Sequence, residues 1–275
     1  MDYRTLIVSL DIDCDNTGLL HVATELADRF DADVIGSATY QQMQLVYGDG
    51  YISGDVVQKD IAEIEKALVH TQEKFRSAFG KRSGRIEWHA ALAFGPLSDV
   101  LVKDARSADL IISRADGADQ NSSARHVSCS DLVMQAGRPV LLVPEKVTTL
   151  PLHRVLVGWK DTKETRRAIA DSLPLLRAAH SVILAEWVIP AEVAVAKLRL
   201  EKVVMWLKRH GITAESHAIA TNGDHRSDLL RFAESRDVDL IVAGAYGHSR
   251  LREWVLGGVT RDLLSNTHIC SLMSH

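Results

Sequence analysis

The sequence predicts an α/β protein built from two copies of one unit, in which helices cover both faces of a mainly parallel sheet. Short apolar runs of strand length alternate with longer runs of helical periodicity along the chain, as expected for right-handed βαβ crossovers. The same order of elements starts again after residue 151. An internal repeat of this kind indicates two equivalent domains in tandem.

The first copy, residues 1–145, is predicted to contain five strands and four helices. A helix is expected at Thr17–Phe30, capped by Asn16 or Thr17, because its apolar residues recur with helical spacing. The other helices are expected at Val56–Phe79, at Gly95–Ser107 and in a short stretch before Pro139. The strands are expected at Arg4–Leu10, Asp33–Thr39, Arg85–Leu92, Asp109–Ser113 and Pro139–Val143.

A polar linker bounded by prolines, Pro144–Pro151, leads to the second copy, residues 152–275. Its long helices are expected at Thr162–Ala179, with a kink at Pro174, and at Ala191–His210, with Gly211 as the C-cap. Shorter helices are expected at Ser227–Arg236 and Val259–Ser265. The strands are expected at Arg154–Trp159, Ser181–Val188, Ile212–Ala220, Val238–Ala243 and His268–Met273.

The repeat is also visible in the residues themselves. Residues 87–90 (EWHA) match 215–218 (ESHA) at an offset of 128, and residues 109–112 (DLII) match 239–242 (DLIV) at an offset of 130. The small drift of the offset places the two copies head to tail along nearly the whole chain.

Composition narrows the classes of function. The chain has 275 residues, 46% hydrophobic and 25% charged, with a net charge of −4 and no block of Lys or Arg. We therefore expect two globular domains and no nucleic-acid partner. No apolar run is long enough to span a membrane, and the N-terminus lacks the basic start of a signal peptide. Three scattered cysteines, Cys14, Cys129 and Cys270, favour reduced thiols and a cytoplasmic protein.

Glycines mark the stretch that follows the fourth predicted strand of the second copy. Gly244 and Gly247 follow the apolar run 240–243, and the pair Gly257–Gly258 comes after nine further residues. Glycine lets a ligand approach the backbone, whose N–H groups can then bind a phosphate. The alternative is a glycine-rich turn that only packs a helix on the sheet.

This pattern resembles the nucleotide-binding signature of the universal stress protein family (UspA-like). The family usually has Ser or Thr after the third glycine, where this chain has Gly258. The change removes a hydroxyl and keeps the backbone amide. The resemblance extends over both copies and implies two tandem Rossmann-like domains (adenine nucleotide alpha hydrolase-like), each with a five-stranded, mainly parallel sheet.

The resemblance also implies which residues bind an adenine nucleotide: ATP, or AMP or ADP, with or without Mg²⁺. Family members usually carry Asp after the first strand, near ribose and adenine; Asp11 matches it in the first copy, whereas Lys160 takes this place in the second. Lys160 could contact a phosphate or be solvated. The implied nucleotide-binding residues are Gly158, Trp159, Lys160, Val188, Gly244, Gly247, His248, Gly257, Gly258, Val259 and Thr260.

The first copy carries a degenerate version of the glycine motif. At an offset of 130, Arg114 and Val127 replace Gly244 and Gly257. Both side chains would fill space that a phosphate needs, and a β-branched residue resists positive φ. We expect the first domain to bind nucleotide poorly or not at all.

Catalytic and metal-binding motifs are missing from the sequence. There is no HExxH, no Cys–His cluster with metal spacing, no P-loop and no Gly-x-Ser-x-Gly. We therefore assign no catalytic residue and no metal ligand, and we expect at most slow ATP hydrolysis. The leading hypothesis is an ATP-binding sensor or adaptor in the stress response. The alternatives are a nucleotide-independent interaction module of the same family and, third, an enzyme of the related adenine-hydrolase class, whose Ser-Gly-Gly-x-Asp-Ser loop is absent.

The resemblance also implies how the two copies meet, because domains of this family commonly dimerise through their last strands. Val140–Val143 and Ile269–Met273 are therefore expected to pair within one chain, and edge strands need some such cover. Such a pair would make an intramolecular pseudo-dimer. A homodimer of whole chains is implied by the resemblance alone.

Overall fold

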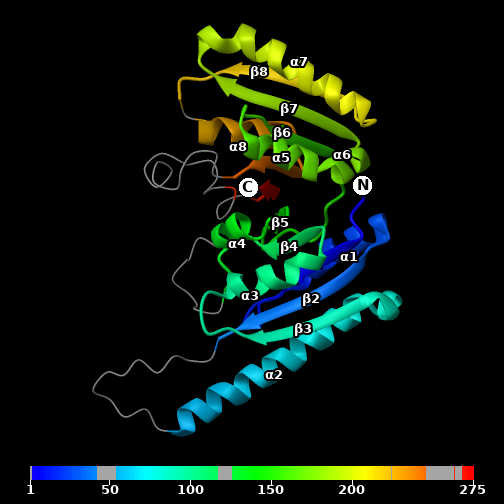
Figure 1. Ribbon diagram of the computed structural model, residues 1–275, viewed down its shortest axis with the longest axis vertical. Helices are drawn as coiled ribbons and strands as arrows, with labels where there is room; N and C mark the ends of the chain where they lie inside the picture. Colours follow the sequence, from blue (N-terminus) through cyan, green and yellow to red (C-terminus); the bar gives the residue numbers. More distant parts are fainter. Residues whose placement is uncertain (1, 42–53, 117–125, 224, 246–262, 264–267) are drawn as a thin grey trace, which may run out of the picture.

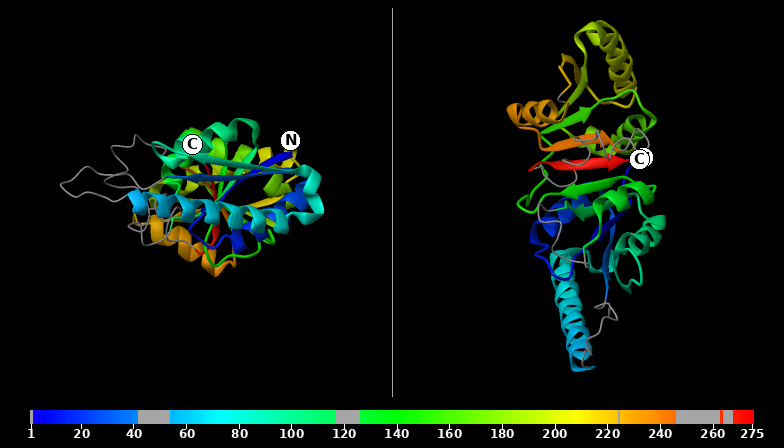
Figure 2. Two further views of the ribbon diagram at one scale, coloured as in Figure 1. Left: turned by 90° about the horizontal axis from the view of Figure 1, so that it is seen from below. Right: turned by 90° about the vertical axis from the view of Figure 1, so that its left-hand side faces the viewer.

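The chain forms one continuous ten-stranded sheet with helices on both faces (Figure 1). The computed structural model describes residues 2–41, 54–116, 126–223, 225–245, 263 and 268–275. The strand order is β3-β2-β1-β4-β5-β10-β9-β6-β7-β8. The molecule is elongated, with helix α2 along one end and helix α7 along the other (Figures 1 and 2).

The N-terminal half of the sheet contains the first five strands. They are β1 (Thr5–Ser9), β2 (Asp33–Tyr40), β3 (Ile86–Leu92), β4 (Leu110–Arg114) and β5 (Val140–Val143). The helices between them are α1 (Thr17–Phe30), α2 (Gly54–Ala78), α3 (Leu97–Asp104) and α4 (Cys129–Gln135), with short 3₁₀ turns η1 (Gly80–Arg85) and η2 (Ala105–Ser107).

The C-terminal half repeats this arrangement. Its strands are β6 (Arg154–Gly158), β7 (Ser181–Val188), β8 (Ala214–Ala220), β9 (Leu240–Gly244) and β10 (Cys270–Ser274). Its described helices are α5 (Lys163–Asp171), α6 (Leu173–Ala178), the 3₁₀ turn η3 (Pro190–Glu192), α7 (Val193–Arg209) and α8 (His225–Ser235). The predicted helix Val259–Ser265 lies outside the described residues except for residue 263.

The two halves meet where β5 pairs with β10. Leu141 lies opposite Leu272 in an antiparallel register, whereas every other strand pair of the sheet is parallel. Figure 2 shows β10, in red, between the green β5 and the orange β9. The predicted pairing of Val140–Val143 with Ile269–Met273 is confirmed, and so is the mainly parallel α/β fold.

Alternation along the strands separates the apolar core into two layers. Leu6 and Val8 point to one face of the sheet and Ile7 to the other, as the two-residue period of a strand requires. Five helices, α1, α2, α5, α6 and α7, bury their apolar sides on the first face, and α3, α4 and α8 cover the second. The central strands are buried on both faces, which explains their continuous apolar sequences.

Most predicted boundaries agree with the structure, but one predicted helix is divided. The stretch Thr162–Ala179 forms two helices, because α5 ends at Asp171 and α6 begins at Leu173. Pro174 lies in the first turn of α6, where its missing N–H costs nothing. The expected kink is therefore a break. The C-cap of α7 is His210 rather than the predicted Gly211, which follows it with φ +78°, a left-handed conformation that commonly ends a helix one residue past the cap.

The segment that joins the two halves, residues 144–153, packs against helix α1. Leu150 and Leu152 are both buried, and the Leu150 N–H donates to the Glu25 carboxylate at 2.8 Å. Leu152 adopts φ 59°, an uncommon value for a residue with a side chain. The Tyr3 hydroxyl also donates to the Asp171 carbonyl across the two halves at 2.7 Å. Among the described helices, none is both long and apolar enough to cross a membrane.

Candidate ligand sites at the carboxyl ends of the strands

Each half of the sheet has one place where ligands bind in folds of this topology. The strand order within a half reverses beside its first strand, between β1 and β4 and between β6 and β9. In open parallel sheets, ligands bind outside the carboxyl ends of the strands at this switch point. In the C-terminal half, Gly158 lies opposite Ala243 in the register of β6 and β9, so Lys160 and Gly244 flank the switch point.

Five of the predicted nucleotide-binding residues are described by the structure: Gly158, Trp159, Lys160, Val188 and Gly244. The other six lie outside the described residues: Gly247, His248, Gly257, Gly258, Val259 and Thr260.

Gly244 is in close contact with the first turn of α5. A Cβ atom at this position would lie 2.6 Å from the backbone carbon of Glu164 and closer still to the nitrogen of Thr165. No side chain fits there without moving the helix. The glycine therefore has a packing reason of its own, which agrees with the alternative interpretation of the motif at this one position.

Trp159 and Val188 serve the core and the sheet. Trp159 is 7% exposed, its backbone N–H donates to the Ala185 carbonyl at 2.7 Å, and its buried indole nitrogen has no hydrogen-bond partner among the described residues. The Val188 carbonyl accepts from the Thr221 N–H at 2.9 Å. Gly158 lies against α8, where a Cβ would meet Leu229 at 3.1 Å. Of the five described residues, Lys160 is the one whose side chain is exposed.

Glu164 is a residue of this site that the sequence analysis missed. It is the second residue of α5, is 2% exposed, and lies beside Gly244. One carboxylate oxygen has no hydrogen-bond partner in the described part of the chain, and the other is 3.5 Å from Lys163 Nζ. Burial raises its pKa, but the helix N-terminal amide, the Thr162 hydroxyl and Lys163 outweigh burial and hold the pKa below its ordinary value. The carboxylate is therefore charged at neutral pH.

In the N-terminal half, an ion cluster fills the equivalent place. His126 Nδ1 lies 2.7 Å from Asp11 Oδ2, and His126 Nε2 lies 3.4 Å from Asp116 Oδ1. The hydrogen bond of Nδ1 with Asp11, and then the contact of Nε2 with Asp116, which is an ion pair without hydrogen-bond geometry, raise the pKa of His126 to about 10, against a smaller effect of burial. The imidazole is therefore protonated across the physiological range.

The residues that replace the motif in this half also have partners within the protein. Arg114 forms an ion pair with Glu145 at 3.1 Å, and Val127 is buried at 3% exposure. The Ser128 hydroxyl accepts from the Asp131 N–H at 3.3 Å and caps α4. The side chains at Asp11, Arg114 and Ser128 are thus all engaged inside the fold.

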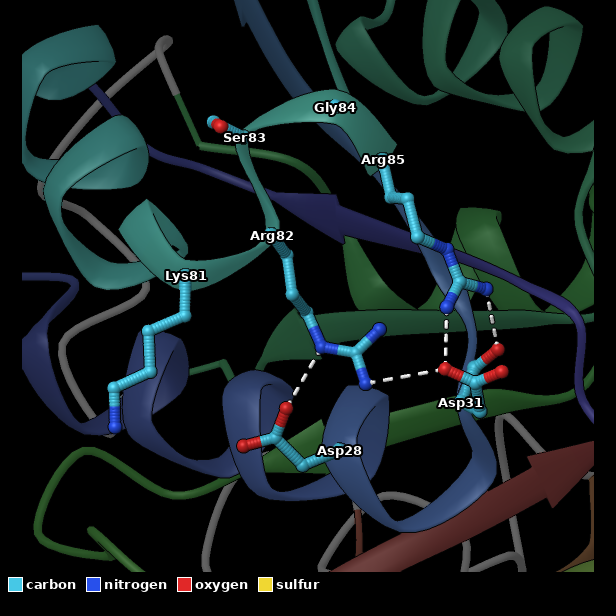
Figure 3. Close-up of a pocket in the computed structure, with 7 residues that line it drawn as sticks. All are labelled: Asp28, Asp31, Lys81, Arg82, Ser83, Gly84 and Arg85. Atoms are coloured by element: carbon cyan, nitrogen blue, oxygen red, sulfur yellow. Dashed lines mark hydrogen bonds and ion pairs between the residues drawn. The ribbon is translucent and has the colours of Figure 1, made fainter.

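A shallow hollow on the N-terminal half is held together by ion pairs and lies at the wrong end of the sheet for a switch-point site. In Figure 3, Arg82 and Arg85 point toward Asp28 and Asp31, while Lys81 points away. Arg82 Nε is 2.7 Å from Asp28, and Arg85 pairs with Asp31 and, at 2.5 Å, with Asp33. These residues lie where β2 and β3 begin, so their charges pin the turn η1 to the end of α1.

Metal-binding groups are not evident in the described parts of the chain. No cluster of three or more His, Cys, Asp or Glu side chains among the described residues is arranged to hold a metal ion. The three cysteines are free thiols, and burial raises the pKa of Cys129 and, to about 12, that of Cys270. These two are poor nucleophiles.

Fold and site together define a Rossmann-like α/β protein with its candidate ligand place at a switch point. The family model described as the Universal stress protein family matches residues 152–273. A universal stress protein of Synechocystis sp. (strain PCC 6803) is 32% identical over 120 residues, which are 44% of this chain and 31% of that protein. This chain thus spans about a third of the curated relative. The likeness to the universal stress protein family therefore rests on residues 152–273, the C-terminal half of this chain.

Solved structures share the whole fold at low sequence identity. A universal stress protein from Archaeoglobus fulgidus DSM 4304 superposes with a TM-score of 0.72 at 14% identity, covering 98% of this chain and 95% of that one. A functionally unknown protein from Pseudomonas aeruginosa PAO1 gives a TM-score of 0.59 at 14% identity, covering 99% and 92%. Other chains of similar length therefore share this overall fold.

Proposed function

We propose that the C-terminal half binds an adenine nucleotide, ATP or its AMP or ADP relatives, and that the protein acts as a sensor or adaptor in the stress response. The observation that carries this proposal is the position of Gly244. It ends β9 at the switch point, and it also begins the sequence Gly-x-x-Gly, nine residues, Gly-Gly. A glycine-rich turn at this point of the fold can present backbone N–H groups to phosphate oxygens.

The charges of the described residues fit a nucleotide that carries a cation. The exposed Lys160 ammonium can pair with a phosphate oxygen. The buried Glu164 carboxylate beside Gly244 would repel a bare phosphate but is a ligand type that Mg²⁺ prefers. Mg²⁺ would neutralise phosphate charge there. On this view Glu164 favours the magnesium complex of the nucleotide over the free anion.

We assign no fast catalysis to this site. The described residues at the switch point, Lys160, Glu164 and Gly244, include no nucleophile held by a general base. Any ATP hydrolysis would be slow, and ligand occupancy rather than turnover would carry the signal. The free thiols, two of them buried, agree with a reducing compartment, and we place the protein in the cytoplasm.

A nucleotide-independent interaction module is the second candidate, and one observation favours it. Gly244 is fully explained by the close packing of α5, and Lys160 replaces the acidic residue found at Asp11 in the other half. A chain that keeps the fold without the ligand would show the same features. In that case the protein would act through its surfaces, including a homodimer of whole chains.

Titration calorimetry with ATP and AMP, each with and without Mg²⁺, separates the two candidates. The double variant Gly257→Val/Gly258→Val tests the cradle and leaves Gly244 intact, because a side chain at Gly244 would displace α5. We expect at least a roughly tenfold loss of ATP affinity, about 1.4 kcal/mol. Gly84→Val is the matched control, since no atom lies within 4 Å of its Cβ position.

Each outcome assigns one candidate. Binding by the wild type and the control, with loss in the double variant, supports the nucleotide site. Equal binding by all three proteins contradicts the cradle and places the ligand elsewhere. Absence of binding by the wild type, measured on protein stripped of co-purified nucleotide, supports the interaction module.

A further inference from the structure

We propose that His126 is an internal ligand of the N-terminal half: its imidazolium occupies the switch-point site and closes it to outside ligands. The N-terminal half would then be a sealed copy, and each chain would keep one ligand place, at the C-terminal switch point. The expectation of one nucleotide per chain rests on the proposed function. The occupation of the N-terminal site by His126 is independent of that function.

The position filled by His126 is equivalent to the candidate site of the other half. The residue before Asp11 donates its N–H to β2, from Leu10 to Ser37 at 2.9 Å, and the residue before Lys160 donates to β7, from Trp159 to Ala185 at 2.7 Å. Asp11 and Lys160 therefore occupy the same place after the first strand of each half. One copy presents a carboxylate where the other presents an ammonium.

His126 joins the two strands that border the N-terminal switch point. Asp11 follows β1 and Asp116 follows β4, and the ring lies between them at 2.7 Å and 3.4 Å. The Asp11 and Asp116 side chains are 8% and 14% exposed, and the His126 side chain is 27% exposed. Two carboxylates with so little access to water need a cation beside them, and the imidazolium provides it.

Neighbouring groups hold both aspartates in place, Asp11 through its main chain and Asp116 through its carboxylate. The Asn16 amide donates to the Asp11 carbonyl at 2.7 Å and accepts from its N–H at 3.3 Å. The Cys129 N–H donates to Asp116 Oδ1 at 3.2 Å. The main chain that carries the Asp11 carboxylate and the Asp116 carboxylate itself are thus both positioned by hydrogen bonds. Preorganised acceptors of this kind favour one occupant over an exchange with solvent.

A site that is already occupied by His126 would exclude a nucleotide more strongly than the loss of the glycines alone. A phosphate would have to displace His126, and it would then meet two unpaired carboxylates. Coulomb repulsion disfavours that state. An outside ligand that replaced the ring would have to be a small planar cation with two N–H donors, because those are the groups the ring offers to Asp11 and Asp116.

Chemical rescue of His126→Gly tests the proposal. We expect the unfolding midpoint of the variant at pH 6 to fall by about 5 °C, and millimolar imidazole, which is a cation at this pH, to restore most of the loss. Pyrazole has the same shape and stays neutral, so it should not rescue. His153→Gly, which removes an exposed histidine, should lose little stability and gain nothing from imidazole. Equal effects of imidazole and pyrazole on His126→Gly would overturn the proposal.

A second measurement on the unaltered protein holds even where His126→Gly fails to fold. Nitrogen-15 NMR of the histidine rings at pH 8 should show one residue with both ring nitrogens protonated, and His126→Asn should remove that signal. A spectrum in which every histidine is neutral at pH 8 would contradict an internal imidazolium.

The number of ATP molecules bound per chain tests the closed N-terminal site and the proposed function separately. We expect calorimetry of the wild type to give one ATP per chain. Two sites per chain would contradict the sealing of the N-terminal half. No ATP binding, together with specific imidazole rescue, would reject the proposed function and leave the internal ligand standing.

Discussion

The two halves of the sheet have the same strand order and opposite chemistry at the same place. After its first strand, the N-terminal half carries Asp11, which pairs with His126 within the fold. The C-terminal half carries Lys160, which is exposed at its switch point. Duplication has kept the scaffold and divided the residues of the site. The difference shows that a shared fold fixes where a ligand place lies, while a few side chains decide whether it is available.

The halves also differ in where a glycine allows a close backbone contact: on strand β9 in the C-terminal half and on helix α1 in the N-terminal half. In the C-terminal half, α5 carries Glu164 as its second residue and β9 carries Gly244 against it. In the N-terminal half, α1 carries Gly18 as its second residue and β4 ends with Arg114. A Cβ at Gly18 would collide with the Val147 carbonyl. Each half therefore places its glycine where a backbone approaches, which warns against assigning a glycine to a ligand from spacing alone.

The largest expected effect comes from filling the contact that distinguishes the C-terminal half. Gly244→Val should destabilise the protein by about 4 kcal/mol, because the new side chain must push α5 off the sheet. Chemical denaturation measures the change. Gly84→Val, at an open position, should stay within about 0.5 kcal/mol of the wild type. A tolerated Gly244→Val would mean that α5 does not pack as closely as described.

The next effect tests an ion pair that the C-terminal half has and the N-terminal half lacks. Glu186 of β7 is buried and pairs with Arg199 of α7 at 2.6 Å, while the equivalent residue of β2 is Ala38. Arg199→Met should cost about 3 kcal/mol, because it leaves a buried carboxylate unpaired.

The double variant Glu186→Ala/Arg199→Met is the control for that prediction. It places alanine where the N-terminal half has Ala38 and should recover most of the stability that the single variant loses. A double variant as unstable as Arg199→Met would show that packing of the arginine stem, and not its charge, stabilises α7. Denaturant midpoints of the wild type, Glu186→Ala, Arg199→Met and the double variant complete this double-mutant cycle.

A smaller effect follows from the ion cluster of the N-terminal half. The pKa of His126 is raised from 6.5 to about 10 in the folded protein. Its contribution is therefore fully present below pH 6.5 and is lost as the pH rises toward 10. We expect it to be about 2 kcal/mol, less than the full shift implies, because the ring is partly exposed and solvent screens the pair.

The measurement for that prediction is the difference in unfolding free energy between the wild type and His126→Asn. The difference should be constant from pH 5.5 to 6.5 and shrink between pH 7 and 10, whereas titrations of other groups cancel in it. A difference that grows with pH would mean that the ring is neutral in the folded state.

The smallest expected effect lies in the hollow of Figure 3. Arg85 is partly exposed and its partners Asp31 and Asp33 are more so. Arg85→Ala should cost less stability than any destabilising change above, because exposed ion pairs contribute little. Salt should reduce the cost further. A loss as large as that of Gly244→Val would show that this turn controls the edge of the N-terminal half.

Much of the fold was predictable because its signals are local. The bounds expected for Thr17–Phe30 and Ser181–Val188 are those of α1 and β7, since helical periodicity and a strand-length apolar run define them. The pairing of β5 with β10 followed from the repeat together with the family resemblance, since domains of that family commonly dimerise through their last strands and edge strands need cover.

Long-range contacts were the part that sequence could not supply. His126 and Asp11 are 115 residues apart, and no periodic pattern links them. Glu164 and Gly244 are likewise distant in sequence, so the packing role of the glycine needed coordinates. The break after Asp171 had a local signal in Pro174, but proline fits both a kinked helix and the start of a new one. The assignments at Gly247, His248 and 257–260 stay predictions, because these residues lie outside the described chain.

The seam between β5 and β10 has a consequence for how the protein is made. During synthesis β5 leaves the ribosome long before residues 270–274, which are its only strand partner on that side. Until they arrive, the nascent N-terminal half carries a bare strand able to recruit another polypeptide. A chain stalled before residue 270 should therefore aggregate or bind a chaperone. Once β10 leaves the ribosome and pairs with β5, the strand edge should no longer be exposed.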